Sequence, residues 1–160
     1  MAFRTGIGYD AHKLELGRPL WLGGVNVPFE QGLAGHSDGD ALLHALVDAL
    51  LGAAGLGDMG AYFPSSDPQY RGVSSLHFLC HAATLLEQGG WRVANLDATI
   101  VAERPRLSSF TQSMRDIIAE SLGLASGRVN IKSTTSDGLG FTGSGKGIAV
   151  HAVATIEGGE

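Results

Sequence analysis

Two separate stretches of the sequence carry residues that commonly ligate a metal ion. Asp10 and His12 are separated by one residue in a segment with strand-like alternation, residues 2–14, so both side chains project from one face. His44 lies in a helical pattern that begins at Asp40. Three such ligands leave a tetrahedral zinc ion one open position, as in catalytic rather than structural sites. The sequence therefore predicts a candidate zinc site of Asp10, His12 and His44.

The stretch around His44 predicts a helix with one apolar stripe, because leucine and valine recur at three- and four-residue spacing after Asp40. Ser37 is a candidate N-cap, with Asp40 completing a capping box in its acidic variant. Asp40, His44 and Asp48 are four residues apart, so we expect them on one polar edge. The alternative is an ordinary surface helix whose polar edge is solvated. The helix is expected to end in the glycine-rich stretch 52–57.

Two predicted loops carry groups that suit phosphate. Residues 32–39 hold His36 and Ser37 just before the helix. Residues 133–147 offer hydroxyl groups, glycine backbone N–H groups and Asp137, which together suit a polyphosphate and its hydrated divalent cation. Metal ions neutralise charge on reacting phosphate oxygens, so a zinc site near such a loop favours phosphoryl transfer.

The second of these loops also resembles a P-loop. Gly140 is followed after four residues by Gly145 and Lys146, which nearly matches the motif of nucleotide-hydrolysing enzymes. Gly147 stands where a serine or threonine would bind magnesium, and a predicted strand follows instead of a helix. The sequence therefore excludes a P-loop here.

A second histidine group lies on the predicted helix 74–88. His77 and His81 are four residues apart with Cys80 between them, formally a metal-binding trio. Phe78 replaces the carboxylate of an H-E-x-x-H motif. We expect a partly buried helix with polar edges and no metal site at this position.

The composition favours one globular domain covering residues 1–160. The chain is 44% hydrophobic, has a formal net charge of −5 and contains one cysteine. This chain length can bury a single sizeable core. The acidic balance without a basic run argues against nucleic-acid binding and against a polybasic membrane anchor. A lone cysteine, no signal-peptide pattern and no apolar run of about 20 residues lead us to expect a cytoplasmic protein without a membrane segment.

The remaining pattern interleaves strands and helices. A hairpin is predicted over 19–29, because Gly23-Gly24 separates two β-rich runs. The other expected elements are helices over 74–88 and 107–122 and strands over 91–103, 128–134 and 147–156. This order predicts an α+β or α/β fold with helices packed on one face of a mixed sheet.

Several segments of the chain resemble those of a known family. The segments GYDAH, GGVNVPFEQGLAGHSDGDALLHALVDALLGAAGLGDMG, FPSSD and IKSTTSDGLGFTGSGKGIAVHAVA are similar to those of the bacterial 2-C-methyl-D-erythritol 2,4-cyclodiphosphate synthase family, in order and across residues 4–157. The resemblance implies an α+β protomer and a homotrimer whose sheets face the three-fold axis, with active sites between adjacent subunits. It also implies that 4-diphosphocytidyl-2-C-methyl-D-erythritol 2-phosphate is cyclised with release of CMP, in the non-mevalonate isoprenoid pathway.

The resemblance also implies roles for individual residues. Asp10, His12 and His44 would hold zinc, and Asp137 would hold magnesium or manganese. His36 would help to stabilise the transition state, and Thr135 would help to polarise the diphosphate. The residues implied in substrate binding are Asp10, His12, His36, Ser37, Asp58, Gly60, Phe63, Ser65, Asp67, Ala102, Pro105, Arg106, Leu107, Ser108, Thr134, Thr135, Ser136, Asp137, Phe141 and Ser144. Residues 63–67 would flank the substrate, and 102–108 would form the cytosine pocket.

Three positions depart from the family pattern. Arg106 stands where many members carry lysine, and Asp137 is one methylene shorter than the usual glutamate. Ser144 and Lys146 occupy positions where some relatives carry arginine and glutamate near a central cavity that is associated with isoprenoid diphosphates. The loss of that arginine argues against such regulation in this chain, with the alternative that Lys146 partly replaces its charge.

Two other functions use the same residues. A zinc hydrolase acting on another nucleotide diphosphate would need an activated water and would form no cyclic product. A non-catalytic trimeric sensor of metal or isoprenoid phosphate would need no complete set of ligands and threonines, and the presence of that set argues against it.

Overall fold

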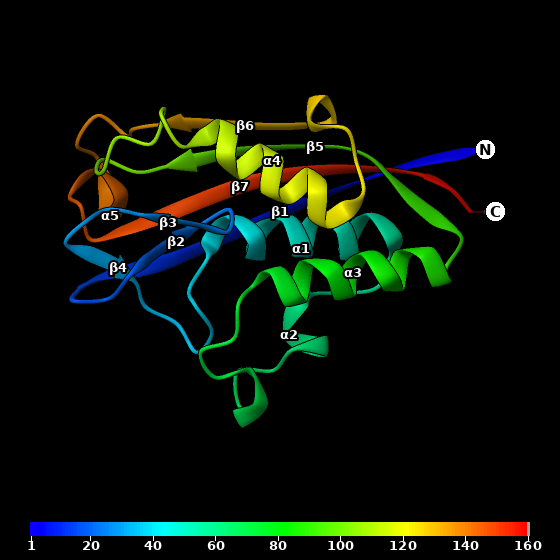
Figure 1. Ribbon diagram of the computed structural model, residues 1–160, viewed down its shortest axis with the longest axis horizontal. Coiled ribbons are helices and arrows are strands. Elements are labelled where there is room, and N and C mark those ends of the chain that lie inside the picture. The colour runs from blue at the N-terminus through cyan, green and yellow to red at the C-terminus, as the bar shows by residue number, and fades with distance from the viewer. Residues whose placement is uncertain (160) are drawn as a thin grey trace.

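Helix α1 (Ala41–Ala54) is the centre of the computed structural model, which describes residues 1–159 (Figure 1). Ten of its residues are buried, and they lie on nearly every side of the helix. The predicted single apolar stripe was therefore too narrow. A helix that is apolar almost all round is one that other elements cover on several sides, and α1 contacts the sheet on one side and α3 (Leu76–Gln88) on another.

A five-stranded mixed sheet forms one layer of the molecule. Its strands are, in spatial order, β4 (Gln31–Leu33), β1 (Ala2–Leu16), β7 (Gly147–Gly158), β5 (Trp91–Val101) and β6 (Val129–Thr134). Only β5 and β6 run parallel, and every other neighbouring pair is antiparallel. The predicted α+β class with a mixed sheet is confirmed.

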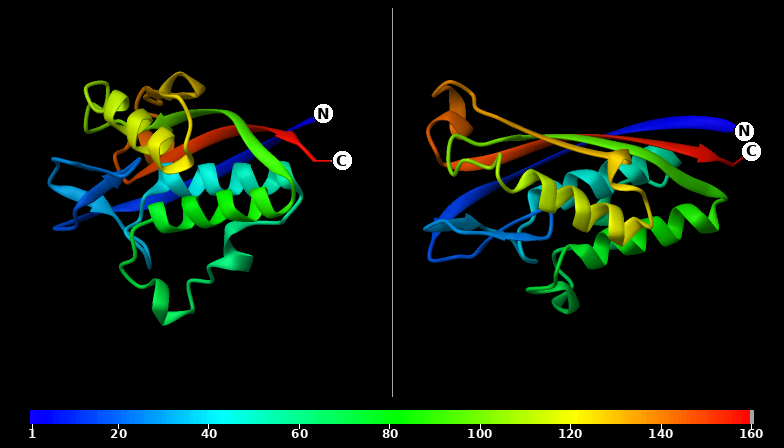
Figure 2. Two further views of the ribbon diagram at one scale, coloured as in Figure 1. Left: turned by 45° about the vertical axis from the view of Figure 1, so that its right-hand side comes forward. Right: turned by 45° about the horizontal axis from the view of Figure 1, so that its top comes forward.

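The helices α1, α3 and α4 (Thr111–Leu122) lie together on one face of this sheet (Figure 2). α1 packs against β1 and β7, α4 packs against β6, and α3 packs against α1 and β5. Side chains alternate along a strand, so one set faces these helices and the other set points away. The set that points away includes four exposed apolar residues, namely Phe3, Ile7, Tyr9 and Val153. The prediction of helices on one face is confirmed.

Several predicted boundaries are corrected by the structure. The hairpin of β2 (Leu20–Leu22) and β3 (Val25–Val27) turns at Gly23-Gly24 as expected. The helix expected over 107–122 begins only at Thr111, because Leu107 is a buried anchor of the preceding loop. The predicted loops contain short elements as well: β4, α2 (Met59–Tyr62), the 3-10 turns η1 (Pro68–Tyr70) and η2 (Ser126–Arg128), and α5 (Gly140–Gly143).

Among the described residues, no helix combines the length and the apolar character that a bilayer crossing requires.

Two glycines let β1 lie against α1 at backbone distance. A Cβ built on Gly8 would lie 1.8 Å from the carbonyl oxygen of Ala45, and one on Gly6 would lie 2.1 Å from that of Ala49. No side chain other than hydrogen fits between the two elements at these points. This contact fixes the distance between the strand that carries Asp10 and the helix that carries His44.

Asp40 is the true N-cap of α1, and the prediction of Ser37 as N-cap was wrong. Its carboxylate accepts from Leu43 N at 3.0 Å, and from Gly23 N and Gly24 N of the hairpin at 2.9 and 2.8 Å. Gly39 has a φ of 77°, which a helix cannot contain, so the helix begins after it. Asp40 is fully buried, so the prediction that it shares a polar edge with His44 was wrong. Burial raises the pKa of the Asp40 carboxyl, and the three N–H donors only partly offset this.

Gly8→Ala is expected to lower the free energy of unfolding by about 3 kcal/mol or more, because the added methyl meets backbone that cannot rotate away. Zinc affinity should fall as well, since Ala45 adjoins His44. Gly52→Ala is the matched control on α1, because its Cβ would lie 3.9 Å from the nearest atom, Ile7 O. Denaturant unfolding should show this control slightly stabilised. A Gly8→Ala protein as stable as the parent would disprove the contact.

Asp40→Ala is expected to cost about 3 kcal/mol or more of unfolding free energy, because it leaves three N–H donors without their acceptor. Asp40→Asn should fall in between, since its carbonyl oxygen can still accept. Glu120→Ala, at an exposed position of α4, serves as the control. Equal stability of the two Asp40 variants and the control in urea titrations would show that the cap and hairpin bonds contribute nothing.

Candidate functional site

The three predicted zinc ligands converge in the structure. The Nε2 atom of His12 lies 2.6 Å from Oδ2 of Asp10 and 3.2 Å from Nδ1 of His44, and the last two atoms are also 3.2 Å apart. Tetrahedral zinc with bonds near 2.1 Å places its ligands about 3.4 Å apart, so the two 3.2 Å separations are close to this spacing, whereas His12 and Asp10 would move apart on binding the ion. Among the described residues, these three form the only group of at least three potential ligands that is close enough to hold one ion. The donor set of two imidazoles and a carboxylate suits zinc.

Neighbouring groups hold both imidazoles in the orientation that ligation requires. Nδ1 of His12 lies 2.5 Å from the carbonyl oxygen of Ala34, so it carries a proton and Nε2 is the atom that faces Asp10 and His44. Nε2 of His44 lies 2.8 Å from Oγ of Ser75, which leaves Nδ1 facing Asp10 and His12. The Ser75 hydroxyl in turn donates to the carboxylate of Asp38. A carboxylate–serine–histidine chain therefore fixes the His44 tautomer.

The charges of the site also favour a cation. Burial by itself raises the pKa of Asp10, but hydrogen bonds and charge from His12 and His44 outweigh it, so the pKa lies below its ordinary value. Burial lowers the pKa of His12, and the bond and charge of Asp10 more than reverse this. Asp10 is therefore an ionised ligand near neutral pH.

The convergent ligands open into a hollow of about 310 Å³. Gly60, Phe63 and Ser65, three of the predicted substrate residues, line it together with the metal ligands. Only 6% of Phe63 is exposed, so its ring is mainly a buried anchor of this segment. Asp48 lines the hollow too, and its carboxylate accepts from Met59 N at 2.7 Å, which ties α2 to α1.

His36 and Ser37 also line this hollow. Oγ of Ser37 lies 3.2 Å from Nε2 of His44, and Nε2 of His36 lies 2.9 Å from the carbonyl oxygen of Asp67. The Asp67 carboxylate turns away and accepts from Gln69 N, and that of Asp58 caps α2 through Ala61 N. The two carboxylates are therefore occupied by local backbone donors.

A second hollow, of about 180 Å³, gathers residues predicted for the cytosine pocket. Its lining includes Ala102, Pro105, Arg106, Leu107, Thr134 and Thr135. These residues come from the segment after β5 and from the end of β6, which are neighbouring parallel strands. The second hollow shares no lining residue with the zinc-site hollow. Within one chain, the two predicted parts of the site are therefore separate surfaces. Ser108, also predicted for the cytosine pocket, follows the lining residue Leu107 in the sequence.

The loop after β6 places its remaining predicted residues differently. Asp137 has a φ of 52° and an exposed side chain, and its backbone N–H points to Oγ1 of Thr135. The Ser136 hydroxyl bonds to that of Thr142 at 2.6 Å. Phe141 is exposed, and the Ser144 hydroxyl donates to its carbonyl oxygen. Ser144 lines a third hollow, beside Leu14 and Phe29, and not the cytosine-type hollow.

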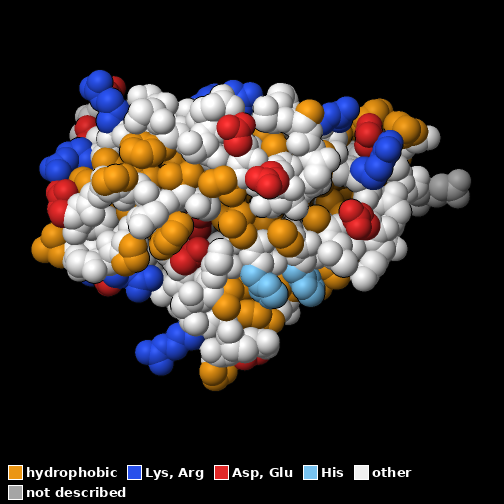
Figure 3. Space-filling view, in the orientation of Figure 1, with side chains coloured by type: hydrophobic (Ala, Val, Ile, Leu, Met, Phe, Trp, Pro, Cys, Tyr) orange, Lys and Arg blue, Asp and Glu red, His pale blue; other side chains and the backbone are white. Residues whose placement is uncertain are grey.

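His77, Cys80 and His81 contact different parts of the molecule. Sγ of Cys80 points to the carbonyl of Ser121, whereas the two imidazoles pack against Phe63, with ring centroids 6.5 and 5.2 Å from it. Figure 3 shows histidine side chains at the surface beside hydrophobic ones on the face that α3 presents. These histidines cover the aromatic anchor of the segment that lines the zinc-site hollow.

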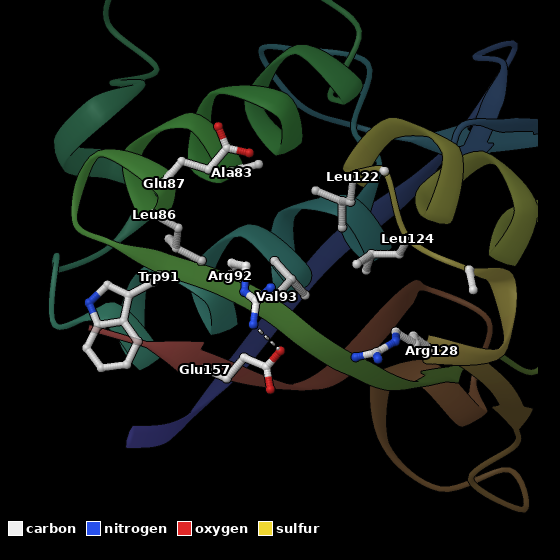
Figure 4. Close-up of a pocket in the computed structure, with 12 residues that line it drawn as sticks. Ala83, Leu86, Glu87, Trp91, Arg92, Val93, Leu122, Leu124, Arg128 and Glu157 are labelled. Carbon is white, nitrogen blue, oxygen red and sulfur yellow. Dashed lines mark hydrogen bonds and ion pairs between the residues drawn. The ribbon is translucent and has the colours of Figure 1, made fainter. Parts of the chain in front are cut away.

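The hollow between the ends of α3 and α4 holds none of the predicted site residues. It measures about 360 Å³ and has an apolar floor that includes Leu86, Leu122 and Leu124 (Figure 4). Arg92 and Glu157 close one side as an ion pair at 3.2 Å. No histidine is among the described residues that line it.

Sequence reasoning missed four residues near the zinc ligands. Ser75 and Asp38 orient His44, and Tyr70 and Phe78 line the hollow. The ring of Phe78 lies 6.0 Å from that of His44. In the sequence, Ser75 lies at the start of the predicted helix 74–88, and its contact with His44 depends on how α3 packs against α1.

Comparisons with known proteins agree with this geometry. The profile of the YgbB family matches residues 3–157. A 2-C-methyl-D-erythritol 2,4-cyclodiphosphate synthase from Desulfatibacillum aliphaticivorans is 53% identical over 96% of this chain and 99% of its own length. The bifunctional enzyme IspD/IspF from Novosphingobium aromaticivorans is also 53% identical, over 98% of this chain, but the chain spans only 40% of that relative's length.

Solved structures show the same fold. The CDP-bound form of a 2C-methyl-D-erythritol-2,4-cyclodiphosphate synthase superposes with a TM-score of 0.88 at 38% identity, over 96% of this chain and 100% of that one. Because the family profile covers nearly the whole sequence, and close relatives align along it, this chain belongs to the YgbB family.

Proposed function

We propose that this chain converts 4-diphosphocytidyl-2-C-methyl-D-erythritol 2-phosphate into 2-C-methyl-D-erythritol 2,4-cyclodiphosphate and CMP. The observation that carries the proposal is the convergence of Asp10, His12 and His44 in a chain that is 53% identical to a synthase of that name. A related synthase binds CDP, which supports a cytidine nucleotide as part of the substrate. The proposal places the reaction in the non-mevalonate isoprenoid pathway. A cytoplasmic location stays a prediction.

The proposed cofactors are zinc at Asp10, His12 and His44, and magnesium or manganese at Asp137. When bound, the two cations would neutralise charge on the diphosphate oxygens. The three side chains fit zinc in their donor types, and two of their three separations are close to the tetrahedral spacing. Asp137 is exposed at the end of a hydroxyl-rich loop, and the short carboxylate suits a hydrated magnesium or manganese ion.

The proposed assembly is a homotrimer with active sites between adjacent subunits. Two observations support it. The zinc-site hollow and the cytosine-type hollow share no lining residue within one chain, so a neighbouring copy would bring the two together. The face of the sheet opposite the helices exposes Phe3, Ile7 and Tyr9, which is typical of a buried interface.

The reaction needs no protein nucleophile. An oxygen of the 2-phosphate attacks the β-phosphorus, and the bond from that phosphorus to the bridging oxygen breaks as CMP leaves. His36 and Ser37 would hold the 2-phosphate end, and His36 would stabilise the transition state. Thr134 and residues 102–108 would hold the cytosine, while the Thr135 hydroxyl would polarise the diphosphate. The chain contributes orientation of the two phosphates and a charged, preorganised surface.

Phosphorus NMR tests the reaction directly. Incubation of the protein with the substrate, zinc and magnesium should give two coupled resonances of a ring diphosphate and one equivalent of CMP. Release of inorganic or acyclic products instead would indicate a hydrolase. No turnover by a folded, zinc-loaded protein would reject the proposed reaction.

His44→Ala is expected to abolish turnover because it removes one of three zinc ligands, while the assembly persists. Metal analysis should show loss of about one zinc per chain, and light scattering should show an unchanged mass. Glu120→Ala, which changes an exposed residue of α4 outside the ligand group, should keep its zinc. An active, zinc-free His44→Ala protein would refute the assignment.

Asp137→Asn is expected to raise the magnesium concentration for half-maximal activity roughly tenfold or more, because a neutral amide replaces a charged ligand. The fold should be kept, since asparagine tolerates the left-handed backbone of this position. Asp116→Asn, on the exposed side of α4, is the control. An unchanged magnesium dependence in the Asp137 variant would place the second cation elsewhere.

A further inference from the structure

A cationic hollow of about 420 Å³ adjoins the zinc site. Its described lining consists of Arg18, Gly35, His36, Ser37, Arg71 and Gly72. Two arginines and a histidine therefore face a space in which no described lining residue is acidic. Guanidinium groups bind phosphate through paired N–H donors, so the lining suits a compact anion.

Among the described residues, neither Arg18 nor Arg71 forms an ion pair with a carboxylate. Asp38 accepts from the backbone and hydroxyl of Ser75, and Asp67 accepts from Gln69. The two arginines thus keep their positive charge available to a ligand.

The arginine groups themselves have donors to spare. Arg18 uses Nη2 for two long contacts of 3.4 Å, to the carbonyl oxygens of Gly35 and Ser37. Its Nε is buried and lacks a hydrogen-bond partner within residues 1–159. A buried donor without a partner costs free energy, so the guanidinium of Arg18 is not fully satisfied by the contacts within the chain. Arg71 is exposed, and its side chain makes no hydrogen bond in the described part of the chain.

The cationic hollow adjoins the zinc-site hollow. His36 and Ser37 line both, and Tyr70, next to Arg71, lines the zinc-site hollow. A Cβ built on Gly35 would lie 3.3 Å from Cε1 of His12. An anion seated between the arginines would therefore lie beside the metal ligands.

We propose that Arg18 and Arg71 form an anion subsite that binds the phosphate monoester of the substrate beside His36 and Ser37. This inference rests on the proposed function, whose substrate carries a phosphate monoester in addition to its diphosphate. The subsite holds that monoester near the metal-bound end of the diphosphate, where its oxygen can attack. It also distinguishes the true substrate from the precursor that lacks the 2-phosphate.

Calorimetry with three ligands tests the subsite on the zinc-loaded full chain, with magnesium left out so that substrate is not consumed. The ligands are the substrate, 4-diphosphocytidyl-2-C-methyl-D-erythritol without its 2-phosphate, and CDP. The unmodified chain should bind the substrate roughly tenfold or more tightly than the ligand without the 2-phosphate. Arg71→Gln and Arg18→Gln should each remove most of that difference and leave CDP binding unchanged.

Arg92→Gln is the matched control, because Arg92 lies in the hollow between α3 and α4 and not near His36 (Figure 4). Arg71→Lys should restore part of the preference, since it keeps the charge but loses the paired donors. Arg18 contacts the carbonyl groups of Gly35 and Ser37. If Arg18→Gln disturbs this loop, the result for Arg71→Gln decides the test.

Two results would overturn the subsite. One is an equal affinity of the unmodified chain for the ligands with and without the 2-phosphate. The other is a loss of affinity in Arg71→Gln that is the same for all three ligands. Failure of the proposed function is distinguishable, because then CDP would not bind or CMP would not be released by the unmodified chain.

Discussion

The direct backbone contact between β1 and α1 is the constraint on which the site depends. Gly6 and Gly8 let the strand approach the carbonyl groups of Ala49 and Ala45. Asp10 and His12 continue along the same strand, and His44 precedes Ala45 on the helix. The positions of all three candidate ligands depend on this one contact, so their geometry is set by the packing of two rigid elements rather than by a loop.

Layers of polar contacts then refine that geometry. Ala34 fixes the tautomer of His12, and Ser75 with Asp38 fixes that of His44. Asp40 lies one turn before His44 but serves a different purpose, since it joins the start of α1 to the β2–β3 hairpin. Two carboxylates that are close in sequence thus have different roles. Asp38 orients His44 through Ser75, and Asp40 stabilises the start of α1 and its contact with the hairpin.

Much of the site was predictable from local sequence patterns. The rest arises from tertiary packing, and for that reason it could not be predicted. Alternation placed Asp10 and His12 on one face, and helical spacing placed His44 on a rigid element. The assignment of Ser37 as N-cap failed because a glycine with positive φ separates it from the helix. Ser75 could not be found, because its role depends on how α3 packs on α1. The burial of α1 was likewise underestimated, since periodicity does not show how many neighbours cover a helix.

The aromatic contacts of Phe63 have a consequence for local stability. The segment from α2 to η1 is held to α3 largely through this ring, which lies against His81 on one side and Phe78 on the other. Phe78 in turn lies beside His44. Local opening of residues 58–70 would therefore expose a side chain packed against a candidate metal ligand. We expect opening of this segment and occupancy of the candidate metal site to be linked equilibria, so that a ligand filling the hollow also slows amide hydrogen exchange.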